Sequence, residues 1–182
     1  SIKNALNDYA IMSRHYSYSS SYGDKSAQNI NLINIPHILY GSKIKKGSIK
    51  LKYYLSGTLL GELQDERMNG ELVQVGPYGS SGSGSVAGVA MYNEGILVIT
   101  GAWDLNHESK TYDGASDTSK WYYFAAGAND PQTIDTSHLS ASFHMEYKGV
   151  NRIQTLNMFC HASYSDANNS TNPTFNTGSL MV

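Results

Sequence analysis

The sequence predicts an all-β fold, an antiparallel β sandwich or barrel-like domain, and three observations support this prediction. Short runs rich in β-branched and aromatic residues recur along the chain, with glycine-containing turns between them. Residues 49–55 alternate apolar and charged or polar side chains, the pattern of a strand with one face in water. Residues 96–100 form the most apolar run, bounded by Gly95 and Gly101, which favours a strand buried on both faces.

The length of 182 residues fits one domain. We expect a β domain over residues 30–165, an N-terminal arm or linker over 1–29 and a polar C-terminal tail over 166–182. Apolar residues in the first dozen positions fall at helical spacing, so this stretch is either a short helix or an extended arm. The tyrosine–serine tract at 16–23 is either an irregular loop or an adaptable contact surface.

The strands expected before the middle of the chain are separated by recognisable turn residues. Pro36 marks the segment around residues 30–40 as an edge strand or an entry segment. Lys50 and Lys52 are expected to face water from the strand at 49–55, and a similar strand follows at 58–65. Asn69-Gly70 then predicts a hairpin into the next strand, at residues 72–75.

A central hairpin is predicted over residues 86–100, with Asn93-Glu94-Gly95 as its turn. We expect the core to form around this hairpin, because it contains the most apolar run of the chain. The preceding glycine–serine stretch, residues 76–84, offers little side-chain surface to bury, and we expect a flexible surface loop there.

The last third of the chain is predicted to hold a polar loop, an aromatic strand and a second hairpin. Residues 107–119 are expected to form the polar loop, and residues 121–127 the aromatic strand. The second hairpin is expected over residues 140–160, pairing strands at 140–147 and 152–160. The residues from Ala162 onward are polar and are expected to dock through Phe175 or onto a neighbour.

Composition argues against two partner classes. The net charge of -2 argues against nucleic-acid binding as the main role. The chain has no run of about 18 apolar residues, so we expect no membrane partner. Its one cysteine, Cys160, excludes an internal disulfide framework and is expected to be a buried small hydrophobe.

Enzyme motifs are weak or missing. Gly82-x-Gly84-x-x-Ala87 fits the loose dinucleotide fingerprint, but that mechanism needs a helix N-terminus, whereas residues 86–92 have strand character. The sequence contains neither a phosphate-binding P-loop motif nor a Gly-x-Ser-x-Gly motif. We therefore predict no enzyme, with no catalytic residue and no cofactor.

Two groups of residues offer the chemistry of a metal site, although our prediction is that the chain binds no metal. His144 and Glu146 alternate on one predicted strand, and His161 from the expected partner strand would complete a set of two histidines and one carboxylate. Oxygen ligands for calcium are available on the polar loop, but their spacing fits no EF-hand: Asp104, His107, Glu108, Asp113 and Asp117. The simpler interpretation of both groups is a solvated polar surface.

Aromatic residues offer a platform on which a sugar ring could stack. The candidates are Trp103, Trp121 and Tyr122, with Tyr123 beside them. Stacking needs an exposed, flat ring with polar neighbours. The alternative is that the two tryptophans anchor the core, because each buries a large apolar area.

Several short blocks of sequence carry a resemblance to a known class of protein. They are GSIKLKYY at 47–54, GELVQVGP at 70–77, GSGSVAGV at 82–89, YNEG at 92–95, TGAWDL at 100–105, MFCHA at 158–162 and NPTF at 172–175. Across residues 35–176 this pattern resembles virion structural proteins of tailed bacteriophages, particularly T4-like phages of marine hosts. The resemblance implies a non-enzymatic component of the virion head, neck, tail or baseplate, whose partners are copies of itself and other virion proteins. It implies no site residues.

Such a subunit would contact its neighbours by β-strand addition or by surface complementarity. The segments 32–40 and 172–182 are expected to make these contacts, with candidate residues Tyr16, Tyr18, Tyr22, Tyr40 and Phe175. Two other functions remain open from the sequence. One is a carbohydrate-binding or receptor-binding module of a tail fibre, with host surface glycan as its partner. The other is a cell-wall glycan hydrolase domain, which needs a cleft with two carboxylates or a metal.

Overall fold

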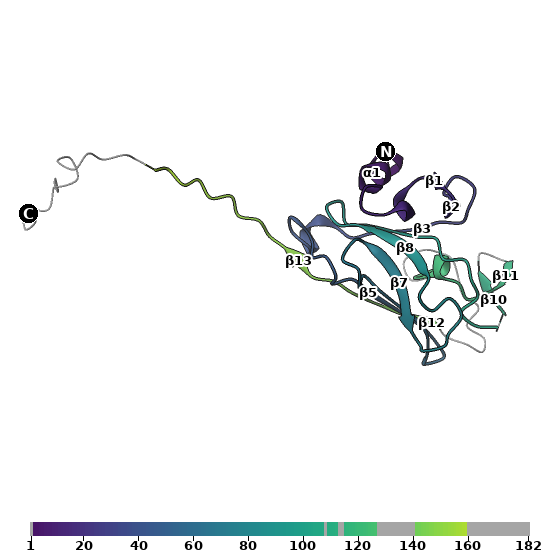
Figure 1. Ribbon diagram of the computed structural model, residues 1–182. Helices are drawn as coiled ribbons and strands as arrows, with labels where there is room; N and C mark the ends of the chain where they lie inside the picture. Colours follow the sequence, from purple (N-terminus) through teal and green to yellow (C-terminus); the bar gives the residue numbers. More distant parts are fainter. Residues whose placement is uncertain (1, 108, 113–114, 127–140, 160–182) are drawn as a thin grey trace, which may run out of the picture. The chain divides into compact units, whose positions relative to one another are not determined.

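One curled antiparallel sheet of seven strands dominates the computed structural model, in the order β12-β5-β6-β7-β8-β9-β3 (Figure 1). The structure describes residues 2–107, 109–112, 115–126 and 141–159. The strands are β3 (Asn31–Asn34), β5 (Lys50–Leu55), β6 (Thr58–Gln64), β7 (Glu71–Gly76), β8 (Val86–Met91), β9 (Ile96–Ile99) and β12 (Ala141–Glu146). This architecture confirms the predicted all-β class.

Five strands, β5 to β9, form a meander in which each strand pairs with the next along the chain. The predicted central hairpin is confirmed, because β8 pairs with β9 with Val89 opposite Val98. Leu97, Val98 and Ile99 are all buried, as expected for a strand covered on both faces. The register of β5 shifts against β6, that of β6 against β7 and that of β7 against β8. Successive irregularities of this kind bend and twist strands, which fits the curl of the sheet.

The larger core lies on the face of the sheet that packs against η3 (Trp121–Tyr123). The aromatic strand predicted at 121–127 is wrong in its described part, because residues 121–123 form this 3-10 turn instead. Side chains three residues apart lie above one another in a 3-10 turn, so Trp121 and Phe124 both enter the core. Trp121 fits there because β6 has a glycine below it: a Cβ on Gly61 would lie 2.5 Å from Trp121 Cζ2.

The N-terminal residues pack against a smaller core that includes inner residues of β8 and β9. They form α1 (Ile2–Tyr9), η1 (Arg14–Tyr16), β1 (Ser19–Ser20) and β2 (Gly23–Asp24). Leu6 and Tyr16 are buried in this core, and the Tyr16 hydroxyl donates a 2.6 Å hydrogen bond to the Ala90 carbonyl. Of the two expectations for the first dozen residues, the short helix is therefore the observed one, and it is docked on the sheet and not extended as an arm.

Three two-stranded ribbons complete the described structure: β1 with β2, β4 (Lys43–Ile44) with β13 (Gly149–Val150), and β10 (Ser109–Tyr112) with β11 (Ala115–Thr118). A further 3-10 turn, η2 (His37–Leu39), follows β3. The polar loop predicted at 107–119 is thus partly wrong, since it contains a hairpin. The hairpin predicted at 140–160 is also wrong: β12 pairs with β5, and residues 151–159 form no strand.

The chain divides into two units, Ser1–Arg152 and Ile153–Val182. The described part of the second unit, residues 153–159, contains neither helix nor strand, and all of its residues are exposed. Cys160, His161, Phe175 and the tail at 166–182 lie outside the described residues.

Candidate functional site

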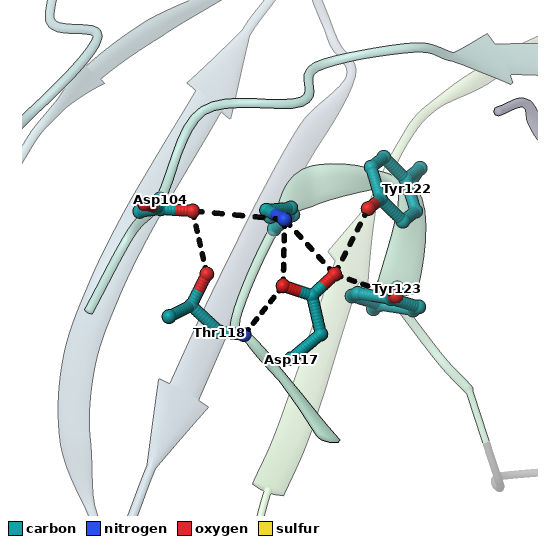
Figure 2. Close-up of polar contacts among 6 residues, drawn as sticks. Asp104, Asp117, Thr118, Tyr122 and Tyr123 are labelled. Carbon is teal, nitrogen blue, oxygen red and sulfur yellow. Dashed lines mark hydrogen bonds and ion pairs between the residues drawn. The ribbon is translucent and has the colours of Figure 1, made fainter. Parts of the chain in front are cut away.

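Asp117, at the end of β11, is the centre of a polar cluster that joins this strand to η3 (Figure 2). Its carboxylate accepts hydrogen bonds from Lys120 Nζ at 2.7 and 2.9 Å and from the Tyr123 hydroxyl at 2.8 Å. The Tyr122 hydroxyl at 3.2 Å and the Thr118 backbone N–H at 2.8 Å also donate to it. With this many donors around one carboxylate, its role is to fix the entry into η3.

The calcium arrangement considered from the sequence is not formed by the two aspartates that the structure describes with their side chains. Lys120 Nζ lies 3.7 Å from Asp104 and 2.7 Å from Asp117, so an ammonium group occupies the space between the two carboxylates. Asp104 additionally accepts a hydrogen bond from Thr118 Oγ1 at 2.5 Å. The side chains of Glu108 and Asp113 are outside the described part of the chain.

Replacing Asp117 with asparagine is expected to destabilise the domain by about 1–2 kcal/mol at neutral pH. Burial raises the pKa of the Asp117 carboxyl, but the hydrogen bonds from Lys120, Tyr123, Thr118 and Tyr122 together outweigh it and lower the pKa from 3.8 to about 2. A depressed carboxyl pKa stabilises the fold above the unfolded-state pKa, and this contribution disappears as the pH falls toward the folded-state value. Urea unfolding of both proteins between pH 6 and pH 2 should show the difference shrinking below about pH 4. A difference that stays constant down to pH 2 would contradict this role.

The other candidate metal site, on β12, lies opposite positively charged side chains. His144 and Glu146 are exposed on the same face of β12, opposite Lys52 and Lys50 of β5. Positive side chains beside these groups disfavour a bound cation. His161 is outside the described residues, and no group of three or more metal-ligating side chains occurs among those described.

The aromatic residues proposed to stack on a sugar do not form an exposed platform. Trp121 is fully buried, which corrects its assignment as a stacking residue and supports the alternative of a core anchor. Trp103 is half-buried beneath the glycine–serine loop, where a Cβ on Gly82 would lie 2.1 Å from Trp103 Nε1. Tyr122 is half-buried and donates to Asp117.

Both tryptophans share one hydrogen-bond acceptor, the buried Gln74 of β7. Gln74 Oε1 accepts from Trp103 Nε1 and Trp121 Nε1, each at 2.8 Å. Its amide nitrogen donates to Ser80 Oγ at 2.9 Å and to the Ser81 carbonyl at 2.8 Å. The glycine–serine loop is therefore tethered to the core, in contrast to the flexible loop predicted from its composition.

A buried carboxylate, Asp65, joins the ends of four strands. It follows β6 and accepts hydrogen bonds from the Gly47 N–H before β5 at 2.7 Å and the Gly70 N–H before β7 at 3.1 Å. It also accepts from the hydroxyl of Tyr92, which follows β8. Burial, followed by the hydrogen bond to Asp65, raises the pKa of Tyr92 well above its usual range, so this hydroxyl remains a donor. Asp65, like Gln74, therefore holds parts of the fold together.

The tyrosines expected at intersubunit contacts have different environments. Tyr16 and Tyr40 are buried within the domain, so they cannot serve as contact residues on its surface, and this expectation is corrected. Tyr40 donates to the Asn93 carbonyl at 3.1 Å. Tyr18 is half-buried, and Tyr22 is exposed and stacks on His15.

An open groove of about 450 Å³ runs along β3, the last strand of the sheet. Residues 30–34, which include β3, line it together with Tyr122, Phe124, Ala125 and Ala126. Asn31 Nδ2 connects the two segments by donating to the Phe124 carbonyl at 2.6 Å. Part of the segment expected to contact a neighbour, residues 32–40, therefore lies on a groove. The groove residues after η3 could not be identified from the sequence, because residues 121–127 are predicted there as a strand.

Comparison with protein-family models, with curated proteins and with solved structures finds no match to this chain. Among the described residues, no helix has the length and apolar character needed to cross a membrane.

Proposed function

We propose that this chain is a non-enzymatic structural component of a tailed-phage virion that acts by assembling with neighbouring subunits. The observation that carries the proposal is the segment of residues 153–159. Its sequence is IQTLNMF, and its large apolar side chains are strongly exposed: Ile153 at 87%, Leu156 at 86%, Met158 at 79% and Phe159 at 95%. Four large apolar side chains exposed within one short segment favour an interaction site.

The roles of the polar clusters support the same proposal. Asp117 and Asp65 are engaged by several donors each, and Gln74 by partners on both sides of its amide. These groups connect strands and loops, and none of them lines the groove beside β3. A hydrolase would instead need carboxylates converging on a cleft, and a glycan-binding module would need exposed rings. The sequence blocks that resemble virion proteins are the reason for proposing a tailed-phage virion as the assembly.

Immunogold electron microscopy tests the proposal on tailed-phage particles whose genome encodes this sequence. An antibody raised against the recombinant chain should label one position on each particle, on the head, neck, tail or baseplate. Antibody absorbed beforehand with the recombinant chain is the control, and it should leave the particles unlabelled.

Mass spectrometry of the same particles after denaturation covers the case of an epitope buried in the assembly. The chain should be present in a fixed ratio to the major capsid protein. If peptides of the chain are absent from denatured, purified particles, the proposed function is wrong.

A further inference from the structure

The backbone groups on the outer edge of β3 pair with no strand in the described part of the chain. The Ile35 N–H donates to the Gly95 carbonyl at 2.8 Å, so residues 33 and 31, two and four positions earlier, also direct their backbone groups toward β9. The backbone groups of Leu32 and Asn34 then point away from β9. Within the described part of the chain, β3 pairs with β9 alone. No strand among the described residues takes up the Leu32 and Asn34 groups, which makes this edge a candidate for pairing with another strand.

This edge lacks the features that usually protect edge strands from pairing. Proteins block exposed edges with charged side chains, prolines or bulges. Residues 30–34 read INLIN and contain no charge and no proline, and the pairing of β3 with β9 has a regular register. Leu32 is 49% exposed and Ile30 is 37% exposed. The groove beside the edge is also lined by the half-buried Tyr122, Ala125 and Ala126.

The 153–159 segment has the properties of a strand that lacks a sheet. It is neither helix nor strand, it carries no charge, and it contains neither glycine nor proline. Leu156 and Met158 are two positions apart, so in a strand they share one face, while Thr155 and Asn157 lie on the other. At about 3.3 Å per residue, seven residues span roughly 23 Å, which is longer than the four residues of β3 require.

We propose that the 153–159 segment of one copy adds to the outer edge of β3 in a second copy, with Leu156 and Met158 covering the groove beside Phe124. The absence of charge on both partners, the outer backbone groups of β3 that no described strand takes up and the exposed apolar residues on each side favour this occupant. Every copy then offers one donor segment and one acceptor edge, a head-to-tail contact that builds rings or filaments. This inference rests on the proposed function and specifies the contact by which the subunits assemble.

Intermolecular cysteine cross-linking tests the contact in the full chain. Cys160→Ser first removes the one native cysteine. One protein then carries Leu32→Cys and a second, differing in mass through a tag, carries Leu156→Cys. After mixing and mild oxidation, a heterodimer should appear on a non-reducing gel. Met68→Cys replaces Leu32→Cys in the matched control, because Met68 is 62% exposed but lies on the connection between β6 and β7, and this pair should remain uncrosslinked.

Sedimentation measurements on single variants provide the second test. The full chain should self-associate, and either Leu32→Lys or Leu156→Asp should weaken the association by at least about tenfold. Met68→Lys should leave it unchanged. Circular dichroism and thermal unfolding of each variant establish that the domain is still folded.

Three results would overturn the inference, and each is distinguishable from failure of the proposed function. Self-association that neither Leu32→Lys nor Leu156→Asp weakens would place the contact elsewhere and still support an assembling subunit. If the mixed single-cysteine proteins give no heterodimer, while a further chain carrying both Leu32→Cys and Leu156→Cys forms an intramolecular disulfide, the segment binds its own chain. A full chain that stays monomeric at high concentration would exclude a second copy as the partner, while the presence of the chain in virions decides the proposed function separately.

Discussion

Replacing Gln74 with leucine is expected to lower the free energy of unfolding by about 3–5 kcal/mol, a large part of the stability of a domain of this size. Leucine would leave the indole N–H groups of Trp103 and Trp121 without their acceptor and would release the Ser81 carbonyl from its donor. An unsatisfied buried donor costs about 1–3 kcal/mol, and Trp121 is fully buried. Chemical denaturation monitored by circular dichroism measures the loss.

Gln64→Leu is the matched control for this prediction. Gln64 is half-buried on β6, and its amide donates to Glu62 at 2.7 Å. Losing this hydrogen bond should lower the free energy of unfolding by less than about 1 kcal/mol. The chain has two tryptophans, and both donate to Gln74, so the intrinsic fluorescence of folded Gln74→Leu should change while that of Gln64→Leu should not. Equal destabilisation by the two substitutions would contradict the prediction that the shared acceptor Gln74 contributes more to stability than Gln64.

Asp65→Ala is expected to have an effect of similar size, about 3–5 kcal/mol, because three donors lose a charged acceptor at once. The Gly47 and Gly70 N–H groups and the Tyr92 hydroxyl all point at this carboxylate. Glu66→Ala, which truncates the exposed neighbouring carboxylate, should change stability by less than about 0.5 kcal/mol.

A double-mutant cycle with Tyr92→Phe separates the hydrogen bond to Asp65 from general damage to the strand ends. Tyr92→Phe alone should cost about 1–2 kcal/mol, because the hydroxyl is one of the three donors. In the Asp65→Ala background the same substitution should cost much less, since its acceptor is already gone. Strictly additive effects would mean that Tyr92 and Asp65 stabilise the domain independently.

The fold class and the meander could be predicted because their signals are local. The alternation at residues 49–55, the apolar run at 96–100 and the turn at 93–95 each specify structure within a few residues. The hairpin of β10 and β11 had a usable signal too. Asp113-Gly114 separates the two strands, and an Asp-Gly pair is a strong indicator of a tight turn.

The errors concern segments whose structure depends on distant partners. Residues 121–124, WYYF, have strong β propensity, but residues 121–123 form a 3-10 turn. In it Trp121 packs against Gly61, and the hydroxyls of Tyr122 and Tyr123 donate to Asp117. The partner of β12 was predicted to be the next apolar segment, whereas the sheet pairs it with β5. Nothing near Phe143 in the sequence identifies Tyr53 as its cross-strand neighbour.

The polar clusters were missed for the same reason. Gln74 and Asp65 read as ordinary strand and turn residues, and only the tertiary structure shows which donors converge on them. The 153–159 segment was part of a predicted strand, residues 152–160, but it forms no strand in the structure. Its lack of a partner among the described residues became apparent only once β12 was seen to pair elsewhere.

The strand order also has a consequence for synthesis on the ribosome, where the chain emerges from its N-terminus. β3 is already made when β9 appears, so one end of the meander is covered as soon as it forms. The other end, β5, must wait for β12, which is translated after β6 to β11. Pairings between segments far apart in the chain form slowly. During translation β5 is thus the strand of the meander that waits longest for its partner, and until then it is exposed to pairing with a wrong one.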